Sequence, residues 1–289
     1  MIPRVLPPVA IRAIVSVAMT IKSLLNRGLA AAAAAALAVT VSAQAPAPAQ
    51  QKPFEPSVGQ AGKDVVWVPT ADTLVAKMLD MAKLTPKDYL IDLGSGDGRT
   101  VIAAAKRGAT AMGIEYNPDM VELSKKNAAA AGVTSKATFV KADIFESDYS
   151  KATVLTLFLL PQLNLKLRPT ILNMKPGTRV VSNSFNMEDW EPDETARIET
   201  ECTSWCTAYL WIVPAKVDGT WTTPNGDLTL KQTFQMVNGT LGPTAISNGK
   251  LHGTEITFSV GNTKYVGQVN GTSIKGTTAS GGAWSATKR

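Results

Sequence analysis

The chain has 289 residues, 45% of them hydrophobic, which is enough to bury a large core in one large or two modest domains. Its formal net charge is +6, but four of the 29 basic residues lie within residues 1–45, which hold no acid, so the rest carries 25 basic against 23 acidic residues. This near balance gives no reason to expect a nucleic-acid partner.

The first 45 residues are typical of an export signal. Lys22 and Arg27 precede Gly28–Val41, an uninterrupted apolar run too short to span a bilayer comfortably, and Ala43-Gln44-Ala45 has the form of a cleavage site. We therefore predict a signal peptide over residues 1–45, a mature chain that begins at Pro46, and an exported, periplasmic protein. The alternative is an uncleaved leader that anchors the protein to the membrane.

Residues 46–63 are predicted to be a linker, because their first part is rich in Pro, Ala and Gln. A helix follows over Ala71–Ala82, where apolar residues recur at helical spacing after the start signal Pro69-Thr70.

Tyr89–Leu93 predicts a buried strand that leads into a glycine loop, Gly94–Gly98, and a helix that begins near Thr100. Alternating glycines permit positive φ and let backbone N–H groups approach a ligand, and the helix adds the positive end of its dipole. Such a loop is suited to a nucleotide. The dinucleotide fingerprint G-x-G-x-x-G would need glycine at position 99, where Arg99 stands, and this argues against a nicotinamide oxidoreductase.

Strands and helices continue to alternate, which predicts a mostly parallel sheet covered by helices. Asn117-Pro118 is a helix start, Glu122 and Lys126 form an i,i+4 pair, and Gly132 ends the helix. The further predicted strands are Thr110–Ile114, Ala137–Lys141, Ala152–Leu160, Arg179–Ser182 and Cys206–Val213.

From Lys216 the pattern changes to period-two alternation broken by turn residues, which predicts a small antiparallel β-module, a meander or barrel, over residues 216–289. The predicted turns are Pro224-Asn225-Gly226, Asn238-Gly239, Asn248-Gly249, Gly261-Asn262 and Asn270-Gly271.

Histidine and cysteine are scarce. The single histidine, His252, disfavours a hydrolytic triad, and we expect it to have no ligand role. Cys202 and Cys206 are too few for a zinc site, so no metal is predicted; whether they form a disulfide stays open.

The spacing D-x-G-x-G-x-G from Asp92 resembles motif I of the class I S-adenosylmethionine-dependent methyltransferases. The resemblance spans about residues 64–213 and implies a methyltransferase-like domain over residues 64–215. It implies a doubly wound, seven-stranded Rossmann-like α/β sheet with a terminal antiparallel pair. Three segments together are similar to a narrower group, the bacterial relatives of the ATP synthase c-subunit lysine methyltransferases. These segments are Trp67–Thr70, Asp92–Arg99 and Leu157–Asn164.

The resemblance implies roles for residues at matching positions. Glu115 would hold the ribose hydroxyls, Tyr116 would cover the adenine face, and Asp143 with Ile144 would lie beside the adenine amino group. The other predicted cofactor-binding residues shape the methionine and ribose side: Asp92, Gly94, Ser95, Gly96 and Gly98. Pro161, Gln162 and Asn164 are the candidates on the acceptor side.

The predicted function is therefore methyl transfer from S-adenosylmethionine by in-line displacement, with a protein lysine as the candidate acceptor. The cofactor already carries an activated methyl group, so the protein mainly has to align a nucleophile and exclude water. The alternative is a noncatalytic exported scaffold that keeps the methyltransferase-like fold and binds a partner.

Overall fold

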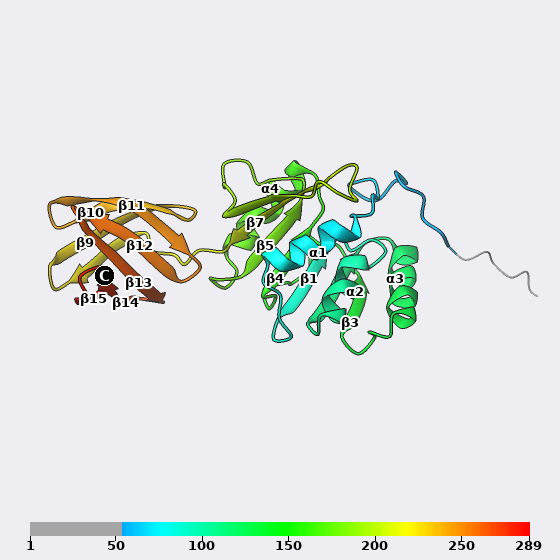
Figure 1. Cartoon of the computed structure of the whole chain (residues 1–289), viewed down its shortest axis with the longest axis horizontal. Coiled ribbons are helices and arrows are strands. Elements are labelled where there is room, and N and C mark those ends of the chain that lie inside the picture. Colours follow the sequence, from blue (N-terminus) through cyan, green and yellow to red (C-terminus); the bar gives the residue numbers. More distant parts are fainter. Residues whose placement is uncertain (1–53) are drawn as a thin grey trace, which may run out of the picture. The chain divides into compact units, whose positions relative to one another are not determined.

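The computed structural model describes residues 54–289, so the predicted leader and the first part of the predicted linker lie outside the described residues. The described chain forms an α/β sheet followed by a closed antiparallel barrel (Figure 1). The predicted fold class is confirmed. None of the helices in residues 54–289 has the length and hydropathy needed to cross a bilayer.

The sheet has seven strands in the order β3-β2-β1-β4-β5-β7-β6. β7 pairs antiparallel with both β5 and β6, and the other pairs are parallel. Chain order reverses at β1, so the carboxyl ends of β1 and β4 border a crevice of the kind where open α/β sheets bind ligands. The strands are β1 (Tyr89–Leu93), β2 (Thr110–Glu115), β3 (Ala137–Lys141), β4 (Val154–Leu157), β5 (Arg179–Asn183), β6 (Glu194–Arg197) and β7 (Thr207–Ile212).

Helices cover both faces of the sheet, which explains the almost uninterrupted apolar strands. Leu90 packs in one hydrophobic cluster with residues of the first three helices, whereas its neighbour Ile91 packs in a second cluster with residues of the fourth. Successive strand residues point to opposite faces, so both faces of β1 must be apolar. The helices are α1 (Asp72–Met81), α2 (Arg99–Lys106), α3 (Pro118–Ala130) and α4 (Pro161–Leu172).

Two local predictions differ from the structure. β4 ends at Leu157 rather than at residue 160, because the chain leaves the sheet there and begins α4 at Pro161. Glu122 pairs with Lys125 at 2.8 Å, one position before the predicted Lys126. The expected seven-stranded sheet left one strand without assigned residues; this strand is β6, a short polar strand at the sheet edge whose sequence lacks the apolar content of the other strands.

The β-module is a closed barrel of eight strands, in the order β10-β11-β12-β13-β14-β15-β8-β9. Its interior is filled by apolar side chains that include Trp221, Leu228 and Phe258. The strands are β8 (Gly219–Thr223), β9 (Gly226–Thr233), β10 (Met236–Leu241), β11 (Thr244–His252), β12 (Glu255–Val260), β13 (Thr263–Asn270), β14 (Ser273–Thr278) and β15 (Ala283–Lys288).

Two of the predicted barrel turns are wrong. Asn238-Gly239 lies inside β10 and Asn248-Gly249 lies inside β11, and the strand register shifts at both places. A Cβ at Gly239 would lie 1.9 Å from the carbonyl oxygen of Thr229, so this glycine permits close strand approach at a bulge. The chain reverses instead between the bounds of consecutive strands, at residues 234–235, 242–243 and 253–254.

The barrel contacts the sheet domain around Trp190. The Phe234 ring stacks on Trp190 with centroids 5.9 Å apart, and Gln235 Nε2 donates to the carbonyl oxygen of Glu191 at 2.8 Å. Ala215 and Val217, on either side of the predicted domain boundary, both pack in the barrel core. The sheet and the barrel group into one compact unit.

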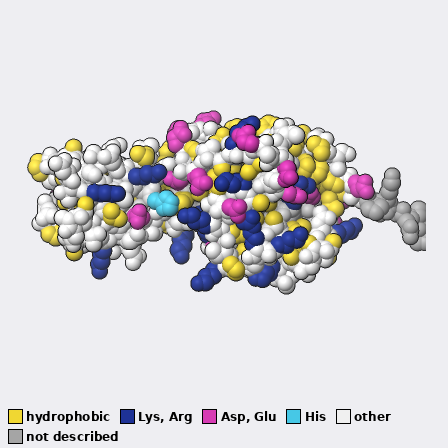
Figure 2. All heavy atoms as spheres, in the orientation of Figure 1, with side chains coloured by type: hydrophobic (Ala, Val, Ile, Leu, Met, Phe, Trp, Pro, Cys, Tyr) yellow, Lys and Arg dark blue, Asp and Glu magenta, His cyan; other side chains and the backbone are white. Residues whose placement is uncertain are grey.

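Surface charge follows the balance seen in the composition. Figure 2 shows basic and acidic side chains interspersed over the face that it presents. Residues 54–289 therefore present charge of both signs on that face rather than a field of one sign.

Candidate functional site

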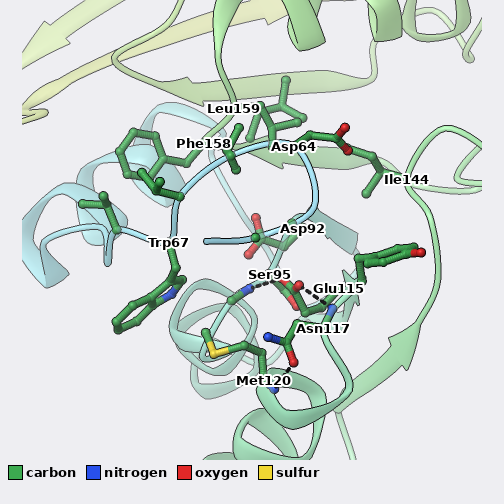
Figure 3. Close-up of a pocket in the computed structure, with 18 of the residues that line it drawn as sticks. Asp64, Trp67, Asp92, Ser95, Glu115, Asn117, Met120, Ile144, Phe158 and Leu159 are labelled. Carbon is green, nitrogen blue, oxygen red and sulfur yellow. Dashed lines mark hydrogen bonds between the residues drawn. The ribbon is translucent and has the colours of Figure 1, made fainter. Parts of the chain in front are cut away.

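A cavity of about 210 Å³ lies at the carboxyl ends of β1, β2 and β4, at the crevice that the strand order creates. Figure 3 shows Trp67 and Ile144 on opposite sides of this cavity, with Asp92 and Glu115 between them. Eight of the nine predicted cofactor-binding residues line it: Asp92, Gly94, Ser95, Gly96, Glu115, Tyr116, Asp143 and Ile144.

The ninth, Gly98, packs against the sheet. It is the N-cap of α2 with φ +83°, and a Cβ there would lie 2.8 Å from the Phe139 ring of β3. Glycine at this position is therefore required by the packing of the loop onto β3 and α3 rather than by contact with the cavity.

Two polar residues of α3 hold the glycine loop in place, and sequence reasoning missed both. Ser124 Oγ donates to the carbonyl oxygen of Gly96 at 2.8 Å, and Asn127 Nδ2 donates to that of Asp97 at 2.9 Å. They lie one helical turn apart on the face that meets the sheet, and this polar pair on an otherwise apolar face was the available signal.

The Glu115 carboxylate accepts hydrogen bonds from the backbone N–H groups of two loops. Its Oε2 accepts from Gly96 and its Oε1 accepts from Asn117, each at 2.9 Å, as Figure 3 shows. Each carboxylate oxygen keeps a second acceptor position. The site thus holds a fixed, hydrogen-bonded carboxylate that can accept a pair of adjacent hydroxyl groups.

Asp92 is buried at the floor of the cavity. Its Oδ1 accepts from Thr156 Oγ1 at 2.6 Å. Burial, with smaller contributions from the nearby charges of Glu115 and Asp97, raises the pKa of Asp92 to about 7. The carboxyl group therefore titrates near neutral pH and would gain from a cation in the cavity.

The adenine side predicted for Asp143 and Tyr116 contains a lysine that sequence reasoning did not identify. The Lys63 ammonium forms an ion pair with Asp143 and lies 5.0 Å from the centre of the Tyr116 ring. The hydrogen bond from Lys63 holds the pKa of Asp143 below its usual value. Asp143 Oδ1 accepts from the Phe145 backbone N–H at 2.9 Å, so Oδ2 is the oxygen that faces the lysine.

Lys63 belongs to a segment that we call the strap, residues 59–70. The strap folds back on itself because Gly59 N donates to the Trp67 carbonyl at 2.8 Å and Trp67 N donates to the Gln60 carbonyl at 2.9 Å. Gln60–Lys63 were predicted to belong to the linker, yet they line the cavity together with the rest of the strap up to Thr70. The cavity is thus closed on one side by residues that precede α1.

The loop residues Asp97 and Arg99 secure the strap to the glycine loop. Arg99 Nη2 donates to Asp97 Oδ2 at 2.6 Å, and Arg99 Nη1 donates to the carbonyl oxygen of Thr70 at 2.8 Å. Asp97 lines the cavity, but this pairing occupies its carboxylate.

The acceptor-side candidates lie just outside the cavity lining. Pro161 is the first residue of α4, Gln162 is exposed, and Asn164 is buried with Nδ2 donating to the carbonyl oxygens of Phe185 and Asn186, each at 3.2 Å. Asn164 thereby orients the loop after β5.

Three aromatic residues line the cavity on this side instead: Phe158, Phe185 and Trp205. Cys202 and Cys206 form a disulfide beside them, which answers the question that the sequence left open. Cys202 lies in the loop before β7 and not on the strand itself, so the four-residue spacing does not prevent closure. Within residues 54–289 no cluster of His, Cys, Asp or Glu could hold a metal ion.

The known proteins to which this chain is similar include methyltransferases. A family model, the ANTKMT methyltransferase domain, matches residues 92–194. A protein-lysine N-methyltransferase of Saccharolobus islandicus is 41% identical over 152 residues, which is 52% of this chain and 94% of that protein. The mouse ATP synthase c-subunit lysine N-methyltransferase is 39% identical over 107 residues, 37% of this chain and 43% of that protein.

The chain spans about half or less of the mouse relative, but nearly all of the archaeal one. Among solved structures, an RNA methyltransferase from Salinibacter ruber in complex with S-adenosyl-L-homocysteine is 46% identical, with a TM-score of 0.49; the match covers 52% of this chain and 96% of that one.

Proposed function

The chain belongs to the methyltransferase family of the archaeal protein-lysine N-methyltransferase, and from this membership we propose that it transfers a methyl group from S-adenosylmethionine to a lysine side chain of a protein. The observation that carries the proposal is the cavity in which the Glu115 carboxylate, the glycine loop and the buried Asp92 meet at the switch point of the sheet.

The residues of the cavity fit this cofactor. Glu115 presents acceptor positions for two ribose hydroxyls, and Tyr116 with Ile144 offers apolar contact for adenine. Ser95 Oγ is buried, lines the cavity and has no hydrogen-bond partner within the described chain, so a polar ligand atom would satisfy it. Asp92 would favour the positive charge of the cofactor. The bound cofactor supplies an activated methyl group on a sulfonium centre.

The chain's own task is to prepare and align the acceptor amine. Three apolar side chains that line the cavity beyond the end of β4, Phe158, Leu159 and Leu163, would exclude water from the approaching amine. Desolvation disfavours the ammonium form, so it lowers the pKa of the lysine and exposes the nitrogen lone pair. The lysine would lose its proton to solvent as its head group enters the cavity, and its neutral nitrogen would then take the methyl group.

A labelling experiment tests the proposal. Purified full chain is incubated with cell-envelope extract and S-adenosylmethionine labelled in the methyl group, and the products are hydrolysed to amino acids. We expect the label in methylated lysine. Before hydrolysis, protease treatment should release the labelled material from the macromolecular fraction and ribonuclease treatment should leave it unchanged. Label that ribonuclease removes would contradict the lysine assignment. Cofactor binding without any transfer in envelope or cytoplasmic extract would favour the noncatalytic scaffold.

We further propose that the protein is exported to the periplasm, as the leader pattern in residues 1–45 indicates. Mass spectrometry of the N-terminus after cell fractionation tests this proposal. A mature N-terminus at Pro46 in the periplasmic fraction would support it. An intact leader on protein that is reachable only from the cytoplasm would contradict it and favour a membrane anchor.

A further inference from the structure

Three aromatic rings gather where the chain leaves neighbouring strands of the sheet. Phe158 follows β4, Phe185 follows β5 and Trp205 precedes β7, and we call these three residues the aromatic cluster. Their ring centroids lie 5.1 to 6.2 Å apart, and all three line the cavity. β4, β5 and β7 are adjacent in the sheet, so three segments distant in the sequence build one surface.

The aromatic cluster lies next to the glycine loop. Leu159, the neighbour of Phe158, is so close to this loop that a Cβ at Gly94 would lie 3.3 Å from its Cδ2 atom. Figure 3 shows Phe158 and Leu159 together on the side of the cavity away from Asn117 and Met120. A group seated on the cluster is therefore beside the cofactor-binding loop and on the side away from the ribose-holding Glu115.

Trp205 is held in an unfavourable position for an apolar residue. Its side chain is 47% exposed, and its backbone has φ +59°, a region that bulky residues seldom adopt. The disulfide between Cys202 and Cys206 closes the short loop that carries it. Backbone strain and an exposed indole that persist together indicate a functional constraint on this residue.

The faces of these rings have no cationic partner in the described chain. The lysine and arginine side chains that stack on aromatic rings in residues 54–289 do so on Tyr116, Phe145, Trp221 and Phe234. An ammonium head group seated against the aromatic cluster would come within cation–π range of more than one ring. Because methylation makes a lysine head group larger and less hydrated while its charge remains, such rings favour the methylated forms.

We propose that the aromatic cluster is the acceptor subsite, that it binds the methylammonium head group of partly methylated lysine, which would lose its proton to solvent before its neutral nitrogen takes a further methyl group, and that the Cys202–Cys206 disulfide fixes Trp205 in it. This inference rests on the proposed function and adds to it a preference among acceptors. It assigns Phe158, Phe185 and Trp205 to specificity and the disulfide to positioning.

Ligand binding tests the subsite independently of catalysis. The full chain is titrated calorimetrically with N-acetyl-trimethyllysine methyl ester and with its uncharged isostere, in which carbon replaces the quaternary nitrogen. We expect the charged probe to bind about tenfold more tightly than the isostere. Trp205→Ala should abolish this preference and Trp205→Phe should retain part of it, while Thr203→Ala, at an exposed position in the same loop, serves as the matched control.

Equal affinity for the two probes, or an unchanged preference in Trp205→Ala, would overturn the subsite. In catalysis, Trp205→Ala should raise KM for a lysine peptide and leave the Kd of S-adenosylmethionine unchanged. If the wild type methylates no lysine yet prefers the charged probe, the proposed function fails and the subsite stands. If lysine methylation proceeds with an unchanged KM in Trp205→Ala, the subsite fails and the function stands.

The disulfide is tested by reduction and by Cys202→Ser. Both should weaken binding of the charged probe as Trp205→Ala does, with unchanged circular dichroism and unchanged Kd of S-adenosylmethionine. A reduced protein that binds the charged probe as tightly as the oxidised one would overturn the positioning role. Reduction of the wild type provides the answer even if the serine variant folds poorly.

Discussion

Asp92 is a residue whose chemistry is set by its burial. Its pKa of about 7 means that the carboxyl group is partly protonated at neutral pH before a ligand binds. A cationic cofactor would stabilise the carboxylate and lower this pKa, so binding would release a proton.

We therefore predict that affinity for S-adenosylmethionine rises with pH, by up to about tenfold per pH unit below pH 7, and levels off above it. The sign follows because protonated Asp92 must lose its proton for tight binding. Calorimetry in buffers of different ionisation enthalpy measures both the affinity and the proton release. Asp92→Asn keeps the acceptor for Thr156 and should show a flat profile; equal pH dependence in both proteins would assign the titration elsewhere.

Glu115 gives a second prediction at this scale. Glu115→Ala removes hydrogen bonds from an ionised group, so we expect cofactor binding to weaken by about 1.5–3 kcal/mol. Glu122→Ala is the matched control, because Glu122 is exposed on the outer surface of α3 and, among residues 54–289, forms an ion pair only with Lys125. Both variants are titrated with S-adenosylmethionine. An equal loss of affinity in the two variants would contradict a ribose role for Glu115.

Among the elements, the strap and the glycine loop depend on each other. A Cβ at Gly96 would lie 2.7 Å from Trp67 Nε1, so the loop can approach the strap only because this residue is glycine. The substitution of Gly96 by a larger residue therefore acts on the strap first, and through the strap on the cavity.

Gly96→Ala should weaken cofactor binding at least about tenfold, because the new methyl group displaces Trp67 and opens the cavity wall. Gly132→Ala is a matched control: its φ of +69° imposes similar strain, yet no atom lies within 4 Å of a Cβ there. Gly96→Ala should lose at least as much thermal stability as Gly132→Ala, because only its methyl group overlaps a neighbour, and only Gly96→Ala should lose affinity. A similar loss of affinity in both would mean that strain alone matters.

At the scale of the whole molecule, the barrel supports the sheet domain but contributes nothing to the cavity lining. Phe234→Ala removes the ring that covers buried Trp190, and we expect it to lower the free energy of unfolding by about 1–3 kcal/mol while cofactor affinity stays unchanged. Denaturant unfolding and calorimetry measure the two effects. Met236→Ala, at an exposed position nearby, is the control. A change in cofactor affinity in Phe234→Ala would instead show that the barrel influences the cofactor site.

The predictability of the fold differs between its parts for a physical reason. The helix at Asn117-Pro118 and the strands around the glycine loop carry short-range signals of capping and of burial on both faces, and the structure follows them closely. The Asn-Gly pairs at 238–239 and 248–249 carry the same local signal as true hairpins, but the barrel uses them as bulges. Register around a closed barrel depends on all eight strands, so a dipeptide cannot reveal it.

Local sequence patterns were enough to locate the parts of the candidate site whose residues are neighbours in the chain: the Asp92 strand end, the glycine loop, Glu115 with Tyr116, and Asp143 with Ile144. Each group follows its own strand, so a local pattern predicts where it lies, whereas its role toward the cofactor comes from the family resemblance and stays a prediction. Other contacts could be found only in the folded chain: Lys63 pairs with Asp143, Trp67 lies against Gly96, and the aromatic cluster forms beside a disulfide. These contacts join segments from separate strands and from the strap, and the packing of the sheet, which no local pattern records, brings them together.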